Sequence, residues 1–228
     1  MFNSIADSYD KLNHILSLDI DKTWRKHAIK EILNGKDKLS VLDLACGTGD
    51  FSIAIARKMK ALGDKDSRVV GVDISDGMLE IMRDKVQKEG LEDFISVNLG
   101  DGENLKFGTG VFDVVTIAFG IRNFENREQG LKEMLRVLRP GGRLVVLELS
   151  LPENALMRWC YNVYFKMILP LIGGSVSGVR SAYRYLPESV KNFPGRKEFM
   201  QILSDCGFSK VTHRAFTFGI CRMYIATK

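Results

Sequence analysis

The chain has 228 residues, of which 45% are hydrophobic and 27% are charged. This balance is typical of a single globular domain with a sizeable core, and it excludes a disordered or fibrous chain. Lys and Arg exceed Asp and Glu by 33 − 28 = 5, which permits weak attraction to an anionic membrane surface but is too small and scattered to indicate nucleic-acid binding.

The cysteines, the histidines and the lengths of the apolar runs exclude further classes of protein. The four cysteines, Cys46, Cys160, Cys206 and Cys221, are widely spaced and form no CxxC pair, so neither zinc nor a disulfide framework is predicted. No two histidines stand at metal-ligand spacing. The start of the chain lacks a signal-peptide pattern, and no uncharged apolar run is long enough to span a membrane. We expect a metal-free protein of the reducing cytoplasm.

Residues 1–34 are predicted to form two helices. Apolar side chains recur at helical spacing over 5–16 and again over 24–33, and Asn34-Gly35 is a stop signal for the second helix. Such a layer either caps a binding site or packs on the sheet, and Trp24 alone does not distinguish the two.

A strand, a glycine turn and a helix come next. The apolar run 39–44 predicts a buried strand, and helical spacing resumes over 51–62. Between them, Gly47 and Gly49 flank Thr48. Glycines permit positive φ and let a ligand lie against bare backbone, while the amides at the helix start face that ligand. The pattern is typical of the opening of a nucleotide-binding βαβ unit.

Acidic residues stand where such a unit binds its ligand. A second predicted strand, 68–73, ends in Asp73 and is followed by Ile74. A carboxylate at this tip can accept hydrogen bonds from both hydroxyls of a ribose. Asp43, just before the turn, adds a carboxylate near the expected position of a cationic ligand. Ser52 replaces the third glycine of the dinucleotide pattern, which makes a nicotinamide dehydrogenase the weakest interpretation.

The α/β alternation continues to the end of the chain. Asp76 is predicted to cap one helix, and residues 139–142, Arg-Pro-Gly-Gly, to end another. This alternation favours a mainly parallel, doubly wound sheet. The further elements are strands at 94–99, 112–118 and 143–149, helices at 76–89 and 126–138, then a helix from 196 and strands at 208–217 and 219–227.

Ligands of such sheets bind beyond the carboxyl ends of the strands. Asp101, beside Gly102, follows the third strand, where it is either a ligand contact or an ordinary turn aspartate. Ala118 ends the fourth strand. The predicted site is formed by five loops, at 45–49, 73–75, 100–103, 118–123 and 149–151.

The glycine turn together with Asp73 resembles the first motif of the class I S-adenosylmethionine-dependent methyltransferases. The resemblance implies a seven-stranded sheet with an N-terminal helical cap and a C-terminal antiparallel hairpin. It also implies S-adenosylmethionine as methyl donor, without a metal. The residues implied to surround the donor are Asp43, Gly47, Thr48, Gly49, Asp73, Ile74, Asp101, Gly102 and Ala118.

Four further stretches are similar to the UbiE/MenG (Coq5-like) quinone C-methyltransferases, and the resemblance spans nearly the whole chain. The most specific part is Phe119-Gly120-Ile121-Arg122-Asn123-Phe124. Asp19 and Asp21 stand where that family usually has glycine and histidine, so no role is assigned to position 21. The stretches are 9–13 with Ser17 and Trp24, 119–124, 136–150 and 185–194.

This resemblance implies methylation of a ring carbon on a reduced, prenylated quinone, either a demethylmenaquinol or the methoxy-benzoquinol precursor of ubiquinone. Removing a hydroxyl proton raises the nucleophilicity of the ring carbon, so a base is needed, and no histidine falls in the five loops. We hypothesise that Arg122 and Asn123 orient the quinol oxygen and stabilise its developing phenolate. The alternative is that Arg122 is a structural partner of a nearby carboxylate.

The stretch 156–172 is the most apolar of the chain, although Arg158 and Lys166 interrupt it and Pro170 breaks it. With the N-terminal helices it is expected to line a channel for the prenyl tail or to touch the membrane surface. Packing in the core or at a homodimer interface is equally compatible with the sequence.

We expect one domain over 1–228. Its predicted parts are a helical cap at 1–34, a donor-binding core at 39–150, an apolar helical insertion at 151–195, and a helix with a hairpin at 196–228.

Two other functions stay open: methylation of another small aromatic or lipid acceptor, and a non-catalytic S-adenosylmethionine-binding subunit of a quinone-synthesis complex. Nucleic-acid methylation loses support, because 118–124 lacks an Asn/Asp-Pro-Pro-Tyr motif and the chain has no Pro-Cys pair. The expected location is cytoplasmic, with peripheral contact at the inner face of the membrane.

Overall fold

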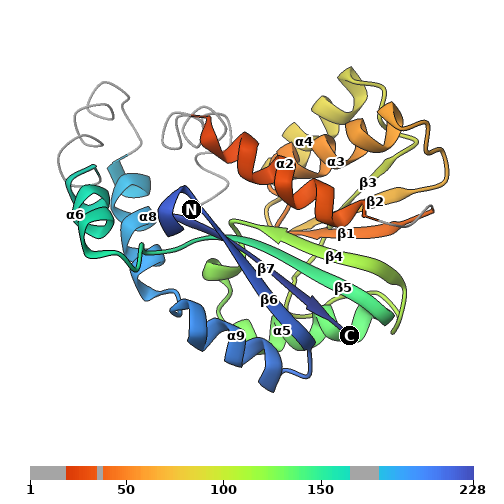
Figure 1. The fold of residues 1–228 in the computed structure, drawn as a ribbon. Helices are drawn as coiled ribbons and strands as arrows, with labels where there is room; N and C mark the ends of the chain where they lie inside the picture. The colour runs from red at the N-terminus through yellow and green to blue at the C-terminus, as the bar shows by residue number, and fades with distance from the viewer. Residues whose placement is uncertain (1–18, 35–37, 165–179) are drawn as a thin grey trace.

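The computed structural model describes residues 19–34, 38–164 and 180–228. Its centre is a seven-stranded sheet in the order β3-β2-β1-β4-β5-β7-β6 (Figure 1). Neighbouring strands from β3 to β5 are parallel, whereas β7 is antiparallel to both β5 and β6. The predicted parallel sheet with a terminal antiparallel hairpin is therefore confirmed. The strands are β1 Ser40–Leu44, β2 Arg68–Asp73, β3 Ile95–Leu99, β4 Phe112–Ala118, β5 Leu138–Leu149, β6 Ser209–Phe216 and β7 Cys221–Thr227.

Helices cover both faces of the sheet. In Figure 1, α2, α3 and α4 lie on one face and α5 and α9 on the other, while α6 and α8 lie beside each other beyond the carboxyl end of β5. Two single turns, η2 and η4, follow β4 and β6. The bounds are α2 Ile20–Ile32, α3 Asp50–Ala61, α4 Asp76–Lys88, η2 Ile121–Asn123, α5 Arg127–Val137, α6 Ala155–Val163, α8 Arg180–Asn192, α9 Arg196–Asp205 and η4 Thr217–Gly219.

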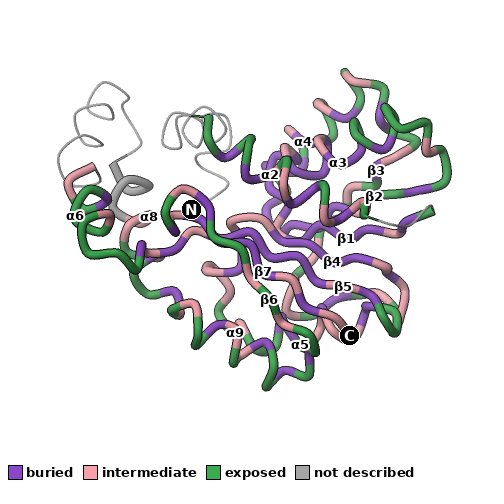
Figure 2. The backbone as a smooth tube through the Cα atoms, viewed as in Figure 1, coloured by how far each residue is buried: buried purple, intermediate pink, exposed green. Residues whose placement is uncertain are grey.

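The core has two parts, one on each side of the sheet. Trp24, Met59 and Met82 belong to the cluster under α2, α3 and α4, whereas Leu131 and Phe199 belong to the cluster under α5 and α9. Figure 2 shows the central strands almost wholly buried, as expected for apolar parallel strands covered on both faces. The two layers hold the carboxyl ends of β1, β2 and β4 in fixed positions.

Two local predictions were wrong. Ser75, not Asp76, caps α4, because its backbone is extended and its hydroxyl accepts a hydrogen bond from the Met78 amide at 3.4 Å. The fifth strand begins at Leu138 rather than at 143, because Leu138 pairs with Phe112 before the register shifts. An irregular register of this kind lets a strand continue through Pro and Gly. The predicted first helix and Pro170 lie outside the described residues.

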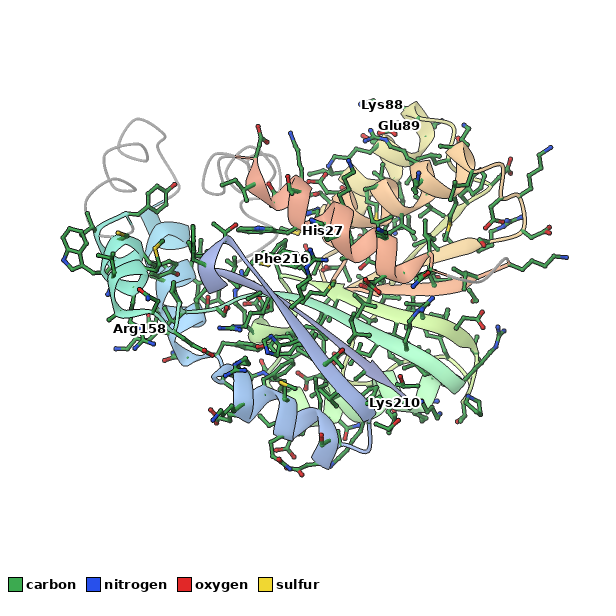
Figure 3. The ribbon with its side chains drawn as sticks, viewed as in Figure 1. His27, Lys88, Glu89, Arg158, Lys210 and Phe216 are labelled. Carbon is green, nitrogen blue, oxygen red and sulfur yellow. The ribbon has the colours of Figure 1, made fainter. Side chains whose placement is uncertain are left out.

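Helix α2 is fastened to the distant C-terminal hairpin. Trp24 Nε1 donates a hydrogen bond to Thr217 Oγ1 at 2.9 Å, across 193 positions of sequence. The His27 ring stacks on Phe216 with centroids 5.2 Å apart, and Figure 3 labels this pair. Helix α2 and the hairpin are thereby held together. Among the described helices, none has the length and apolar character needed to cross a membrane.

Candidate active site

A cavity of about 320 Å³ lies where the carboxyl ends of β1 and β4 meet α2, α6, α8 and η4. Its volume is close to the lower end of the range for small-molecule sites, roughly 300 Å³. Of the residues predicted from sequence, its wall contains Asp43, Gly47, Thr48, Ala118 and Arg122. Strand tips and helices that are far apart in sequence thus form one concave surface.

The glycine turn requires its glycines. Gly49 precedes α3 with a φ of 87°, and a Cβ added there would lie 2.4 Å from Met82 Cγ. Gly47 has a φ of 55°, and its amide donates to Asp73 Oδ2 at 2.8 Å. Both φ values lie in the left-handed region that side chains disfavour. The turn therefore presents backbone to the cavity at Gly47, and the tip of β2 holds it in place.

Asp73 and Ile74 form an amphipathic pair at the end of β2. The Asp73 carboxylate also accepts a hydrogen bond from the Ser75 amide at 2.8 Å, and burial raises its pKa. Ile74 is 73% exposed. A hydrogen-bonding carboxylate beside an open apolar side chain suits a ligand that carries both hydroxyls and an aromatic base. Neither residue is part of the cavity wall.

Asp43 is a buried carboxylate beneath the glycine turn. It is 1% exposed and accepts a hydrogen bond from Ser52 Oγ at 2.5 Å. Burial raises the pKa of Asp43 to about 7, against the lowering effects of the Ser52 hydrogen bond and of the Arg25 charge. Ser52, which replaces the third glycine of the dinucleotide pattern, is thus a partner of this acid. A cationic ligand at the turn would favour the ionised carboxylate.

The loop after β3 contains Asp101 and Gly102, which also lie outside the cavity wall. Asp101 is exposed, and its Oδ1 accepts a hydrogen bond from the Glu103 amide at 2.8 Å, as in a turn aspartate. A Cβ on Gly102 would lie 2.6 Å from Phe124 Cζ. The Phe124 ring thereby packs the β3 loop against the loop that follows β4.

Arg122 is both a residue of the cavity wall and the partner of a buried carboxylate. Its Nη1 lies 2.7 Å from Glu148 Oε1, and the two side chains are 7% and 0% exposed. Nη1 also donates to the Phe119 carbonyl, and Nε donates to Ser189 Oγ at 3.3 Å. The two interpretations of Arg122 from sequence are therefore compatible with each other.

Asn123 lies next to the cavity wall rather than in it. Its Oδ1 accepts a hydrogen bond from Tyr185 Oη at 2.7 Å, which joins η2 to α8. Tyr185 comes from the stretch 185–194. The bond links two of the stretches that carry the family resemblance.

Sequence analysis expected the N-terminal helices near the site but gave no role to the individual side chains of α2 that line it. Asp21, Trp24 and Arg25 line the cavity, and Asp21 is 3% exposed with its Oδ2 3.4 Å from Arg25 Nε. The spacing of Asp21 and Arg25 by four positions indicated that they share a helix face, but not that this face turns toward the sheet ends. Phe119 also lines the cavity; it falls in the predicted loop 118–123 but was given no role of its own.

Helix α6 contributes Met157, Cys160 and Tyr161 to an apolar part of the cavity wall, and Tyr164, which follows the helix, also lines it. Within the described part of the chain, no group of three or more His, Cys, Asp or Glu residues is placed to hold a metal ion.

Solved structures resemble this fold closely enough to define its class. A S-adenosylmethionine-dependent methyltransferase from Aquifex aeolicus has a TM-score of 0.64 at 18% identity, covering 89% of this chain and 88% of that one. A putative S-adenosyl-L-methionine-dependent methyltransferase from Methanococcus maripaludis has a TM-score of 0.71 at 19% identity, covering 100% and 94%. The fold is that of a class I S-adenosylmethionine-dependent methyltransferase.

The family follows from sequence similarity along the whole chain. The ubiE/COQ5 methyltransferase family matches residues 1–228, and the chain belongs to it. It is 44% identical to the demethylmenaquinone methyltransferase of Bacteroides fragilis, covering 100% of this chain and 91% of that protein. It is also 44% identical to the ubiquinone/menaquinone biosynthesis C-methyltransferase UbiE of Geobacter sulfurreducens, covering 100% and 87%.

The raised pKa of Asp43 makes protein stability depend on pH. Because the pKa is about 7 in the folded protein and 3.8 ordinarily, the stabilising contribution is complete below pH 3.8 and is lost as the pH rises toward 7. Asp43→Asn cannot ionise and still accepts the Ser52 hydrogen bond. We expect the stability advantage of this variant over wild type to grow by about 2–3 kcal/mol from pH 5 to pH 8, measured by urea denaturation.

The control for this prediction is Asp93→Asn, which changes an exposed aspartate and should leave the pH dependence of wild type unaltered. A difference between Asp43→Asn and wild type that stays constant with pH would show that the buried carboxylate does not titrate in this range.

Proposed function

We infer that this chain transfers a methyl group from S-adenosylmethionine to a ring carbon of a prenylated quinol in menaquinone or ubiquinone synthesis. The observation that carries this inference is the cavity itself. Its wall combines the glycine turn at Gly47, Arg122 of η2 and the apolar residues of α6. Membership of the ubiE/COQ5 methyltransferase family supports the same conclusion.

The residues around the glycine turn fit the donor. S-adenosylmethionine supplies a methyl group on a cationic sulfur, whose S–methyl electron pair stays on sulfur when the ring carbon forms its new bond. Asp43 offers a buried negative charge near that cation. Asp73 accepts hydrogen bonds from the ribose hydroxyls, and Ile74 provides an apolar surface for the adenine. Asp101 and Gly102 border the adenine from the β3 loop.

Close approach to the donor depends on small residues. Gly47 and Gly49 keep side chains away from the turn, Thr48 lies between them, and Ala118 leaves space at the tip of β4. The reacting methyl group is therefore directed past Ala118 into the part of the cavity beside Arg122. Alignment of this kind lowers the barrier by several kcal/mol.

Arg122 stabilises negative charge that develops on the quinol oxygen. A guanidinium keeps its proton, so it contributes electrostatic stabilisation rather than proton abstraction. Glu148 and the Phe119 carbonyl hold it against the cavity wall. Asn123 lies beside the cavity wall, and its Oδ1 accepts a hydrogen bond from Tyr185, so the role proposed for Asn123 toward the same oxygen falls to its amide nitrogen. The ring-carbon proton leaves afterwards, and the aromatic quinol is restored.

The prenyl tail follows the apolar end of the cavity toward the membrane. Helix α6 has apolar residues on two faces. Met157 and Tyr161 face the cavity, while Leu156 and Trp159 are 67% and 63% exposed. Phe218 in η4, at the other side of the cavity, is 75% exposed. We assign this apolar rim to the lipid surface, where a prenylated substrate resides. The competing assignment is an interface between two copies of the chain.

The function is tested by turnover. Purified protein with S-adenosylmethionine is expected to convert chemically reduced demethylmenaquinone into a product heavier by one methyl group, measured by mass spectrometry. The methoxy-benzoquinol precursor of ubiquinone, assayed in parallel, distinguishes the two quinol classes. Binding of S-adenosylhomocysteine without turnover on either quinol would favour the non-catalytic scaffold, and turnover only on other aromatic or lipid acceptors would favour the rival methyltransferase.

The role of Arg122 is tested without leaving a buried charge unpaired. In the double variant Arg122→Gln/Glu148→Gln the pair becomes neutral and can still form hydrogen bonds. We expect kcat to fall about 100-fold, with S-adenosylmethionine affinity within about twofold of wild type. Arg139→Gln, which removes an exposed ion pair with Asp113, serves as control. Near-normal turnover of the double variant would reject the role of Arg122.

The apolar rim is tested with vesicles. Leu156→Ser/Trp159→Ser should weaken co-sedimentation with anionic phospholipid vesicles and raise KM for a long-tailed quinol more than for a short-tailed one. Leu62→Ser, which changes a 62% exposed leucine remote from the cavity, should change neither. Unaltered vesicle binding combined with a shift from dimer to monomer would instead assign the rim to self-association.

A further inference from the structure

Quinol methylation needs a proton acceptor, and Arg122 cannot supply one. Within the described part of the chain the cavity wall contains no histidine, and its carboxylates are Asp21, Asp43 and Asp50. We propose that Asp21, on α2, accepts the proton of the quinol hydroxyl. This assignment rests on the proposed quinol methylation and gives a residue of the helical cap a part in the reaction.

The other two carboxylates are placed for different tasks. Asp50 Oδ1 lies 2.8 Å from Lys85 Nζ, and its Oδ2 lies 3.8 Å from Arg25 Nη1. Asp43 lies under the glycine turn and is held by Ser52, on the side of the cavity assigned to the donor. Asp21 comes from α2 and, among the described residues, is the carboxylate that α2 contributes to the cavity wall.

Asp21 is buried among atoms that also border the Arg122 loop. The Arg25 guanidinium, 3.4 Å from Asp21, lies 5.6 Å from the centroid of the Phe119 ring. The Phe119 carbonyl in turn accepts a hydrogen bond from Arg122. Asp21 on α2 and Arg122 on η2 are thus linked by a series of contacts through Arg25 and Phe119.

A second observation places Asp21 close to the partner of Arg122. The pKa of Cys221, a buried thiol on β7, is raised by burial and by the negative charges of Glu148 and Asp21. Both carboxylates therefore lie near the same side chain. Asp21 and Arg122 both line the cavity, so a quinol bound there is bordered by both residues.

The charges around Asp21 allow it to gain and lose a proton without leaving a cation unpaired. Arg25 lies between Asp21 and Asp50, and Asp50 also pairs with Lys85. When Asp21 becomes neutral, Arg25 keeps Asp50 as its partner. Among the described residues, Lys22, Arg25 and Cys221 interact electrostatically with Asp21, while Asp50 on α3 and Glu148 on β5 share a partner with it, Arg25 and Cys221 respectively.

The proton transfer is balanced as follows. The quinol O–H bond breaks, its proton passes to a carboxylate oxygen of Asp21, and its electron pair stays on the quinol oxygen as a phenolate beside Arg122. The phenolate raises the electron density at the ring carbon that is methylated. The proton lost from the ring carbon goes to solvent, and Asp21 returns its proton to the quinol oxygen or to solvent before the next turnover.

The first test compares Asp21→Asn with wild type on a short-tailed demethylmenaquinol. Loss of a general base is expected to lower kcat about 100-fold or more, while the affinity for S-adenosylmethionine stays within about twofold of wild type. Asp19→Asn is the matched control, because Asp19 precedes the same helix and forms an exposed pair with Lys22 at 2.7 Å. A kcat of Asp21→Asn within about threefold of wild type overturns the proposal.

The second test separates proton transfer from a structural role. An imidazole titrates about two pH units above a carboxylate, so the acid limb of the kcat–pH profile should move upward by about two units in Asp21→His. A purely structural residue would not move this limb. If thermal unfolding shows that Asp21→Asn is not folded, the kcat–pH profile of Asp21→His is the test of the proposal. An acid limb that does not move in Asp21→His overturns the assignment.

Calorimetry gives a readout that does not depend on turnover. At pH 7 the analogue 2-hydroxy-1,4-naphthoquinone is an anion that resembles the deprotonated substrate. Its binding to wild type should take up about one proton more than its binding to Asp21→Asn, measured in two buffers of different ionisation enthalpy. Equal uptake argues against Asp21 as the acceptor. Absence of methylation by wild type would instead refute the proposed function, so the two failures are distinguishable.

Discussion

The buried ion pair between Arg122 and Glu148 is the constraint on which the site depends. Glu148 is fully buried on β5 and accepts hydrogen bonds from Arg122 Nη1, the Arg122 amide and the Leu149 amide at 2.7, 3.2 and 2.8 Å. Loss of one partner of such a pair costs about 3–5 kcal/mol, because a charge is left buried without compensation. The pair therefore fixes the loop after β4, and with it the wall of the cavity that faces the substrate.

Around this pair, the cavity is closed by contacts between segments that are far apart in sequence. Trp24 on α2 bonds to Thr217 in η4, and Tyr185 on α8 bonds to Asn123 in η2. Each contact joins an appended helix to a turn at the carboxyl end of the sheet. In the proposed function, the parallel core supplies the donor side and the appended helices enclose the acceptor. Acceptor preference in this fold is therefore expected to change through these helices while the glycine turn stays the same.

Burial and charge have different consequences in the two halves of the cavity. On the donor side, Asp43 is an acid whose pKa burial raises to about 7, so a cationic ligand both pairs with it and favours its ionised form. On the acceptor side, Asp21 belongs to a chain of alternating charges with Arg25, Asp50 and Lys85. The apolar residues of α6 lie beyond it. This gradient from charged to apolar surface corresponds to a substrate with a polar ring and a long hydrocarbon tail.

The sequence by itself determined the sheet, the glycine turn and the acids at the strand tips, because these depend on local periodicity and on residues a few positions apart. Gly47, Asp73 and the two strands predicted at 208–217 and 219–227 belong to this class. Sequence reasoning missed the start of β5, because a strand that continues through Pro140 depends on its pairing with β4. Only the tertiary structure decided that Arg122 pairs with Glu148 and that Asp21 faces the cavity. Their positions depend on which face of α2 packs on the sheet and how the β4 loop meets β5. These are long-range contacts that no local pattern encodes.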